Sequence, residues 1–466
     1  MTGTSVPVSG ASVPVTAAHD TRSPSVVEAM GVVLHDAGGP GDADPRVLLG
    51  LALRRNPRRA QLLVSRVLGK HVPTDPRLVR AAGLLLGARV ADVLDGCAPR
   101  PLPVDALHTA VAGDRDAASA VHAEAVDGSG RAHDVAVLGF AETATALGHC
   151  VAEALRADYL HSTRRPVAGI ATAGGFTEEH SHATDHLLLP TDPAFLTAPR
   201  PLVLVDDELS TGRTAFNTIA ALHETAPRQR YVLAALVDSR PPDSRLVDDV
   251  AALGARLDVV SLARAGVALP ADLAERADAL RAAVDAGPTG PGPRSPDVVR
   301  VRLADLGWPH PTPAGARHGF GPADHARLAA ALPAVAAALA GTAGLHPGAR
   351  TLVLGTEELM AVPLRLAQEL ADAGHDVSFS TTTRSPAVVT DDPGYALTSG
   401  ITFPAHDDPA DGPGPRYAYN VGGPGDQRWD HVLVVVDPPA DTPALDAGLL
   451  AALAGRTHAL TVVVTP

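Results

Sequence analysis

The residues most able to do chemistry in this sequence lie in one short run, Leu202–Thr214 (LVLVDDELSTGRT). Four apolar residues, typical of a buried strand, lead into the acidic residues Asp206, Asp207 and Glu208, and a Ser-Thr-Gly turn then opens a helix. Backbone N–H groups at such a turn point toward one centre, and the start of the helix adds partial positive charge. The run therefore predicts a binding site for a phosphate group.

The turn and the acids in front of it indicate what carries that phosphate. Ser210, Thr211 and Thr214 have hydroxyls that can donate to phosphate oxygens, and Gly212 permits close approach of the backbone. The two aspartates can accept hydrogen bonds from paired hydroxyls, such as those at the 2′ and 3′ positions of ribose. Phosphate at one end and a vicinal diol at the other describe a 5-phosphoribosyl group. The alternative is an ordinary strand–turn–helix joint whose aspartates cap the helix.

Short β-branched runs alternate with Ala- and Leu-rich segments along the chain, and these elements must position the site. We expect strands at 133–139, 201–205, 231–237 and 257–262, and helices at 142–156 and 214–225. The strands are apolar without alternation, which indicates a parallel sheet covered by helices on both faces. In such α/β sheets, ligands bind beyond the carboxyl ends of the strands, where the acidic run lies.

Glycine and proline mark the expected domain boundaries. Residues 1–25 are expected to be a disordered tail, and 286–298, rich in Gly and Pro, a linker that cannot hold a helix. The linker separates a larger domain at 26–285 from a smaller α/β domain at 299–466. A further Gly/Pro/Asp-rich stretch at 404–415 is expected to be a long loop.

The second domain echoes the first in the order of its motifs. Leu-Gly pairs ending at Gly139 and Gly355 each precede a helix with a glutamate, and a strand then ends in Thr-Arg-Arg-Pro (163–166) or Thr-Arg-Ser-Pro (383–386). Later, 431–438 resembles the strand before the acidic run, but no Gly-containing turn follows it. Two interpretations stay open: a degenerate copy that has lost its phosphate loop, and coincidence in a chain biased toward Ala, Leu and Val.

The composition argues against several classes of protein. A formal charge of −14 over 466 residues disfavours DNA binding. Cys97 and Cys150 are too few for a disulfide framework or a four-cysteine zinc site. The chain opens without a basic, apolar leader, and the apolar stretch Leu328–Ala340 is interrupted by Pro333 and too short to span a bilayer. We expect a soluble, cytoplasmic protein without a membrane partner.

The run at 202–214 resembles the signature of the type I phosphoribosyltransferases, which is an apolar strand, two acids and a Thr-Thr-Gly-x-Thr-like loop. The resemblance implies a ligand, phosphoribosyl pyrophosphate (PRPP), with its ribose hydroxyls on Asp206 and Asp207 and Mg²⁺ beside the same two residues. The 5′-phosphate would be held by Ser210, Thr211, Gly212, Arg213 and Thr214, and Glu208 of the same run is also expected to bind PRPP.

Four further segments, 63–73, 137–149, 177–186 and 381–388, narrow the resemblance to one bacterial group. Its members join a phosphoribosyltransferase-like domain to a C-terminal TRSP domain and are found with tellurium-resistance-type stress operons. This resemblance implies a phosphoribosyltransferase that makes a nucleoside-like metabolite, without naming the base. We expect a homodimer.

Two loops are further candidates for the site. The first is the loop Phe140-Ala141-Glu142-Thr143, which follows a strand. In the type I fold, the loop at this place contacts pyrophosphate through its backbone amides. The alternative is that Glu142 and Thr143 cap the next helix. The segment 176–186 matches the position of the loop that closes over PRPP.

In that lid-like segment, Glu178, His180 and His182 are the expected catalytic residues. His180 or His182 would contact or protonate pyrophosphate, because imidazole titrates near neutrality. A zinc site formed by His180, His182 and His186, and a solvated loop without function, are the alternatives.

Basic residues complete the set. Lys70 is the only lysine, and its compact ammonium suits a phosphate contact. It lies within 54–80, which holds eight basic residues and one acid, and this patch suits pyrophosphate, a nucleotide or RNA. Arg164, taken as a PRPP ligand, and Arg384 occupy the echoed Thr-Arg-x-Pro elements, where they either reach phosphate or pack across the two domains.

The sequence thus predicts transfer of 5-phosphoribose from PRPP to a nucleobase-like acceptor, with release of pyrophosphate, to make a nucleotide-like metabolite in a stress response. A PRPP- or nucleotide-sensing regulator that binds RNA without turnover is the alternative. The reverse reaction, which releases a base from a nucleotide, stays open as well.

Overall fold

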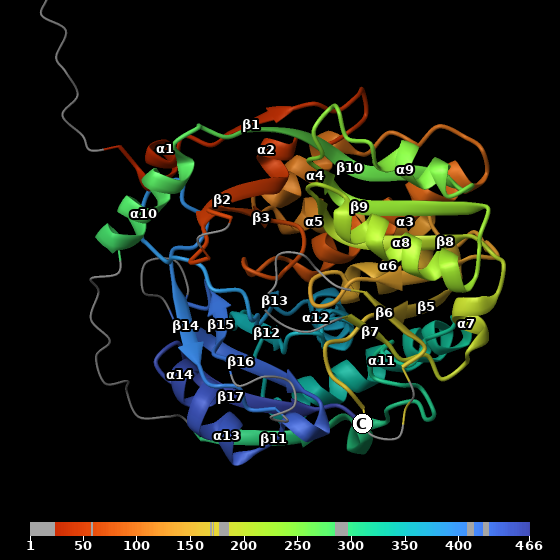
Figure 1. Ribbon diagram of the computed structural model, residues 1–466. Helices are drawn as coiled ribbons and strands as arrows, with labels where there is room; N and C mark the ends of the chain where they lie inside the picture. Colours follow the sequence, from red (N-terminus) through yellow and green to blue (C-terminus); the bar gives the residue numbers. More distant parts are fainter. Residues whose placement is uncertain are drawn as a thin grey trace, which may run out of the picture.

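The computed structural model contains two largely parallel sheets, one in each half of the chain (Figure 1). It describes residues 24–466 except for 57–58, 168–169, 171, 177–185, 285–296, 408–413 and 423–427. Most of the predicted tail and linker, and the middle of the predicted loop at 404–415, lie outside the described residues.

The first sheet has six strands in the order β1-β10-β9-β8-β4-β5. All of its neighbours are parallel except β1, which pairs antiparallel with β10 at the edge. The strands are β1 Val33–Asp36, β4 Ala136–Gly139, β5 Asp158–His161, β8 Leu202–Leu209, β9 Arg230–Asp238 and β10 Arg256–Ala268.

Helices cover both faces of this sheet, which is why its strands are apolar without alternation. Val203 and Val205 belong to a cluster that includes residues of α3 (Pro76–Leu94) and α6 (Thr145–Leu155). Leu204 belongs to a second cluster, with residues of α8 (Arg213–Thr225) and α9 (Leu246–Ala252). The predicted α/β architecture is confirmed.

The second sheet has five parallel strands in the order β11-β17-β16-β12-β13. They are β11 Val298–Arg302, β12 Thr351–Gly355, β13 Val377–Thr381, β16 Trp429–Val436 and β17 Thr457–Val464. Helices α11 (Pro322–Ala343), α12 (Ala361–Asp372), α13 (Pro443–Leu445) and α14 (Ala451–Leu453) accompany the sheet.

Three antiparallel hairpins and several short helices complete the described fold. The hairpins pair β2 Leu49–Leu53 with β3 Gln61–Ser65, β6 Gly174–Phe176 with β7 His186–Leu188, and β14 Gly400–Phe403 with β15 Arg416–Tyr419. The helices are α1 Val26–Met30, α2 Pro45–Leu48, α4 Val104–Val111, α5 Arg115–Asp127, α7 Ala194–Thr197 and α10 Leu273–Val284.

The two sheets repeat the same arrangement, so the echo in the sequence is a structural repeat. The order β5-β4-β8-β9 in the first sheet corresponds to β13-β12-β16-β17 in the second. A hairpin follows β5 in one half and β13 in the other, namely β6–β7 and β14–β15. A shared strand order with equivalent insertions is not what coincidence in composition would produce.

The second copy has no counterpart of the phosphate loop predicted in the first, and its sequence gives the chemical reason. After β16, the chain enters a short 3₁₀ turn at Pro438–Ala440 and then a helix that begins at Pro443. Proline has no backbone N–H, so this segment cannot present the row of amide donors that the first copy has at 210–214.

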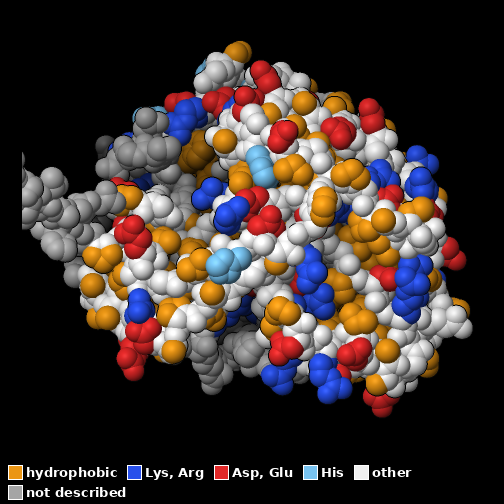
Figure 2. Space-filling model, turned by 90° about the horizontal axis from the view of Figure 1, so that it is seen from above, with side chains coloured by type: hydrophobic (Ala, Val, Ile, Leu, Met, Phe, Trp, Pro, Cys, Tyr) orange, Lys and Arg blue, Asp and Glu red, His pale blue; other side chains and the backbone are white. Residues whose placement is uncertain are grey.

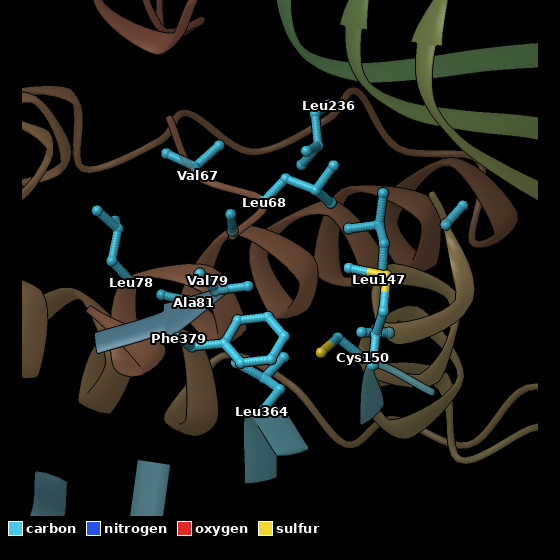
Figure 3. Packing of buried hydrophobic residues seen from close by; sticks show 14 of the residues in the cluster. Val67, Leu68, Leu78, Val79, Ala81, Leu147, Cys150, Leu236, Leu364 and Phe379 are labelled. Atoms are coloured by element: carbon cyan, nitrogen blue, oxygen red, sulfur yellow. The ribbon is translucent and has the colours of Figure 1, made fainter. Parts of the chain in front are cut away.

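The two halves share one apolar core (Figure 3). Phe379 of β13 and Leu364 of α12 lie in the same cluster as Val79 of α3 and Cys150 of α6. Two backbone bridges flank this core: the segment before α3 pairs with β13 at Thr74↔Phe379, and the segment before α11 pairs with β5 at Tyr159↔Phe320. Each half therefore lends a segment to the sheet of the other.

Several predicted boundaries are wrong: β4 begins at Ala136 rather than 133, and β10 continues to Ala268 rather than 262. Helix α6 begins at Thr145, because residues 141–144 form turns, and β8 continues to Leu209, because it stays paired with β9 up to Asp238. Helix α11 runs through Pro333 for 22 residues, so it is not the short, interrupted stretch expected. By length and composition alone, α11 could cross a membrane. However, its Leu328, Leu332 and Leu339 are buried in the shared core.

Close packing of α3 on α6 depends on glycine, which gives a direct test of the fold. A Cβ at Gly83 would lie 2.4 Å from the Cβ of Cys150, so Gly83→Ala is expected to lower the free energy of unfolding by about 1–3 kcal/mol. The control is Gly341→Ala in α11, where a Cβ meets nothing within 4 Å; this change is expected to leave stability unchanged or raise it by up to about 1 kcal/mol. Urea denaturation measures both, and equal effects would contradict the packing.

Candidate functional site

The predicted phosphate turn lies between β8 and α8, and its geometry requires glycine. Gly212 is the residue before α8, with φ of +78°, a conformation that side chains with a Cβ rarely adopt. A Cβ at this position would also lie 2.7 Å from Leu246 Cδ2. The turn therefore holds its shape only with glycine at its apex.

The backbone of this turn is open to a ligand. Among the described residues, the amides of Thr211, Gly212 and Thr214 donate to no protein acceptor. The Arg213 amide lies 3.3 Å from Thr211 Oγ1, a long hydrogen bond that a stronger acceptor could replace. The side chains of Thr211 and Arg213 are exposed. The open amides of Thr211, Gly212 and Thr214 at a helix start have the arrangement that the predicted anion-binding turn requires.

The acidic residues lie within the strand rather than in a turn after it, which corrects the prediction. Asp206 pairs with Ala235, and Glu208 with Val237, in the ladder between β8 and β9. Because side chains alternate along a strand, Asp206 and Glu208 lie on one face and Asp207 on the other. Asp206 Oδ1 accepts a hydrogen bond of 2.9 Å from the Asp207 amide. The two aspartates are therefore not equivalent partners for one diol.

Glu208 is held by two partners at the end of β8. Arg59 donates to both of its carboxylate oxygens, at 2.8 and 3.1 Å, and Ser239 Oγ donates to Oε1 at 3.0 Å. Both bonds from Arg59 come from its Nη2, and a carboxylate that accepts from a guanidinium and a hydroxyl together is held in place. Glu208 therefore ties the loop after β2 to the carboxyl ends of β8 and β9.

The loop Phe140–Thr143 lies beside the phosphate turn. It follows β4, and β4 pairs with β8 so that Gly139 lies opposite Val205. The Phe140 amide donates to Val205 O at 3.0 Å, and the Ala141 amide to Ser162 Oγ at 2.9 Å. In contrast, the amides of Glu142 and Thr143 donate to no acceptor among the described residues. The loop thus offers a second pair of open donors next to the first.

Lys70 is buried beneath this loop. Its Nζ lies 2.9 Å from Thr143 Oγ1 and 3.5 Å from Glu142 Oε2, and only 6% of the residue is exposed. The preceding Gly69, with φ of +70°, allows the chain to pass against β13, since a Cβ would lie 2.4 Å from Phe379 Cδ1. Lys70 therefore supports the loop from behind, and a direct phosphate contact by Lys70 stays a prediction.

The carboxylate of Glu142 is held by the second half of the chain. Thr383 Oγ1 donates to Glu142 Oε2 at 3.1 Å, and Arg384 Nε lies 3.1 Å from Oε1. Burial by itself would raise the pKa of Glu142, but the nearby charges of Lys70 and Arg384 outweigh it and lower that pKa. The buried carboxylate is therefore charged, and it anchors the loop while the amides of the loop stay free.

A second buried glutamate makes the equivalent contact in the other direction. Glu358 accepts hydrogen bonds from Thr163 Oγ1 at 2.8 Å and from the Arg164 amide at 3.0 Å, and Arg317 lies 3.2 Å away. Burial would raise the pKa of Glu358, but Arg317, His161 and the Arg164 amide lower it to about 2. The Arg164 backbone is thus committed to the contact between the two halves.

The predicted lid lies largely outside the described residues. Glu178, His180 and His182 belong to the undescribed segment 177–185, so their catalytic roles stay predictions. His186 is buried in β7, where its Nδ1 is 2.8 Å from Ser162 Oγ. This is the serine that also receives the Ala141 amide, so His186 supports the same loop.

The donors present fit a Mg²⁺ ion that is bound mainly through a phosphorylated ligand. Among the described residues, no group of three or more His, Cys, Asp or Glu side chains could hold a metal ion. Asp206 and Asp207 are partly exposed carboxylates at the phosphate turn. Because Mg²⁺ commonly takes one or two carboxylates together with phosphate oxygens and water, these two residues are the ones that would hold it.

The basic segment 54–80 is partly neutralised by acidic side chains in the fold. Lys70 and Arg80 are buried. Arg80 forms an ion pair with Glu153, and Arg77 forms one with Asp75. On the described part of the face shown in Figure 2, basic and acidic side chains are interspersed. Four of the eight basic residues are paired with acids, namely Arg59 with Glu208, Lys70 with Glu142, Arg77 with Asp75 and Arg80 with Glu153. Binding of a ligand by the segment stays a prediction.

Sequence reasoning left the role of Arg384 open and missed Thr383, Ser162 and Glu357. Arg384 Nε bridges Glu142 at 3.1 Å and Glu357 at 2.9 Å, so of the two alternatives, reaching phosphate or packing across the domains, it does the second. The signal was present in the repeated Thr-Arg-x-Pro element, but the partner of each copy lies in the opposite half.

Comparison with known families agrees with this arrangement. A family model described as "Phosphoribosyl transferase" matches residues 48–266, and the model of the TRSP domain, C-terminal to that family, matches residues 314–453. The chain carries a phosphoribosyltransferase domain followed by a TRSP domain. Its enzyme class is therefore that of the phosphoribosyltransferases, which are pentosyltransferases. No curated protein sequence matches the chain.

Solved structures of phosphoribosyltransferases are similar to parts of the chain. Adenine phosphoribosyltransferase from Rhodothermus marinus is 19% identical over 28% of this chain and 70% of its own, with a TM-score of 0.21. The adenine enzyme from Thermoanaerobacter pseudethanolicus is 22% identical over 34% and 86%, with a TM-score of 0.23. Orotate phosphoribosyltransferase from Aeropyrum pernix is 20% identical over 33% and 74%, with a TM-score of 0.18. Such low scores carry no argument about the acceptor.

The buried charge of Glu358 makes stability depend on pH. Its pKa falls from 4.5 to about 2 on folding, so its contribution is complete above pH 4.5 and is lost as the pH falls toward 2. The full loss is on the order of 3 kcal/mol. Urea denaturation between pH 5 and pH 3 should therefore give a shallower decline for Glu358→Gln than for the unchanged protein. Glu275→Gln, at an exposed site on α10, should leave the decline unchanged; equal slopes for all three proteins would contradict the assignment.

Proposed function

We propose that the first domain transfers 5-phosphoribose from PRPP to a ring nitrogen of a nucleobase-like acceptor and releases pyrophosphate. The observation that carries this proposal is the pairing of two open sets of amide donors. The turn at 210–214 and the loop at 140–143 follow the adjacent strands β8 and β4. PRPP carries a phosphate at one end and a pyrophosphate at the other, so two neighbouring anion sites suit one molecule.

In this reaction, the lone pair of the acceptor nitrogen forms a bond to C1 of ribose as the C1–oxygen bond to pyrophosphate breaks. The electron pair of the broken bond leaves with pyrophosphate, and the proton of the nitrogen passes to water or to a base. Because positive charge develops on the ribose ring, the residues around it must position the reactants and stabilise the leaving group. The amides of Glu142 and Thr143 would do this for pyrophosphate, and those of Thr211, Gly212 and Thr214 for the 5′-phosphate.

Mg²⁺, bound to PRPP and to Asp206 or Asp207, would supply charge that neutralises pyrophosphate. Closure of the segment 176–186 would exclude water and bring Glu178, His180 and His182 to the ligand. A cytoplasmic location, a homodimer and a nucleotide-like product used in a stress response remain part of this proposal. The location is inferred from the composition of the chain, and the product and its role from the sequence resemblance.

The two aspartates provide the direct test. The double variant Asp206→Asn/Asp207→Asn is expected to lower turnover at least 100-fold and to weaken PRPP binding while the fold is retained, because the amides cannot replace a carboxylate toward ribose hydroxyls or Mg²⁺. Pyrophosphate release from PRPP and Mg²⁺ with a panel of bases measures turnover, and calorimetry measures binding.

Asp158→Asn is the matched control, because Asp158 begins β5 at the amino end of the same sheet. This variant is expected to keep turnover within about twofold. The single variants, Asp206→Asn and Asp207→Asn, should differ from each other, since the two side chains lie on opposite faces of β8. Unchanged kinetics in the double variant, with an intact fold, would overturn the proposal.

A further inference from the structure

We infer that the TRSP domain is an internal partner of the catalytic domain and that Thr383 and Arg384 are positioning residues for its pyrophosphate-side loop. These residues hold the side chain of Glu142, and Glu142 in turn fixes the open amides of 142–143. The inference rests on the proposed function, because it assigns a role in PRPP binding. It adds that the second domain is required for that binding.

The contacts between the two halves occur twice, once in each direction. Thr383 Oγ1 and the Arg384 amide face Glu142 Oε2, at 3.1 and 3.5 Å. In the mirror contact, Thr163 Oγ1 and the Arg164 amide face Glu358, at 2.8 and 3.0 Å. The threonine of each Thr-Arg-x-Pro element therefore donates to a glutamate of the opposite half. Thr383 donates to Glu142, in the loop after β4, and Thr163 donates to Glu358, in the loop after β12.

Each half also supports its own loop in the same way. The Ala141 amide donates to Ser162 Oγ at 2.9 Å, and the Glu357 amide donates to Thr382 Oγ1 at 3.1 Å. The backbone bridges Thr74↔Phe379 and Tyr159↔Phe320 form a further equivalent pair. In the paired contacts between the halves, a segment of the first half contacts a segment of the second, and the equivalent segments contact each other with the halves exchanged. Such reciprocal contacts are the pattern of a two-fold interface between copies of one protein. Here both copies lie in one chain.

The two sides of this interface differ in what lies next to each glutamate. Glu142 belongs to a loop beside the open turn at 210–214. Glu358 follows β12, which pairs with β16, and the 3₁₀ turn after β16 begins with Pro438 and Pro439. Prolines offer no amide to a phosphate. The Glu142 contact therefore holds a loop next to open amides, whereas the corresponding turn in the half of the chain that carries Glu358 has no such amides at its two prolines.

The physical link from Thr383 to the ligand is short. Thr383 is fully buried, so its replacement by an apolar residue leaves a charged, buried oxygen of Glu142 without one of its donors. The loop must then shift to find another partner, and its amides shift with it. Displacement of donors by about 1 Å is sufficient to weaken binding and catalysis strongly.

The repeat supplies a matched pair of variants. Thr383→Val and Thr163→Val each remove one fully buried hydroxyl from equivalent contacts, with little change in volume. Both are expected to lower the midpoint of thermal unfolding to a similar extent. Only Thr383→Val is expected to raise the KM for PRPP and its calorimetric Kd, by about tenfold or more, while Thr163→Val stays within about twofold.

A second pair covers the case in which a threonine variant fails to fold. Arg384→Gln removes the cation 3.1 Å from Glu142, and Arg317→Gln removes the cation 3.2 Å from Glu358. The expected split is the same: the KM for PRPP rises about tenfold for Arg384→Gln and stays within about twofold for Arg317→Gln. A merely structural contact would lower the yield of folded protein without this difference in KM between the two sides.

The outcomes separate this inference from the proposed function. If the unchanged chain binds PRPP with Mg²⁺ and each pair of variants splits as described, the inference is supported. If it binds PRPP but the two members of each pair behave alike, the inference is overturned and the proposed function stands. If the unchanged chain does not bind PRPP at all, both are overturned.

Discussion

The structure depends on the need to neutralise buried carboxylates where its two halves meet. Glu142 is removed from water, which would raise its pKa and discharge it unless cations lay close by. One cation, Lys70, comes from the same half of the chain, and another, Arg384, comes from the other half. The charged loop can therefore keep its conformation only when both halves are folded against each other.

The repeat shows how one architecture can take two roles. Both halves keep the strand order, the hairpin after the second repeated strand and the Thr-Arg-x-Pro element, because these build the shared core and the interface. They differ in the segment after β8 and β16, where binding needs backbone donors. Glycine and hydroxyl residues at 210–214 supply such donors, and prolines at 438 and 439 remove them. The two halves therefore share their packing although only the first has the glycine turn.

Much of the site could be predicted because its chemistry is local. The turn at 210–214 forms from consecutive residues, and its φ of +78° at position 212 favours the glycine that the sequence places there. Less could be predicted about the acids in front of it. Whether Asp206 to Glu208 form a strand or a turn depends on β9, which comes about thirty residues later, and the pairing partner was not visible in the local pattern.

By itself, the sequence determined the α/β class, the glycine turn between β8 and α8 and the repeated motifs, since periodicity and backbone chemistry act over a few residues. Only the tertiary structure decided what each charged residue does. Thr383 and Glu142 are 241 positions apart, and the cations of 54–80 find acids far along the chain. Ion pairs and hydrogen bonds follow distance in space and exclusion of water, and neither can be read from neighbours in sequence.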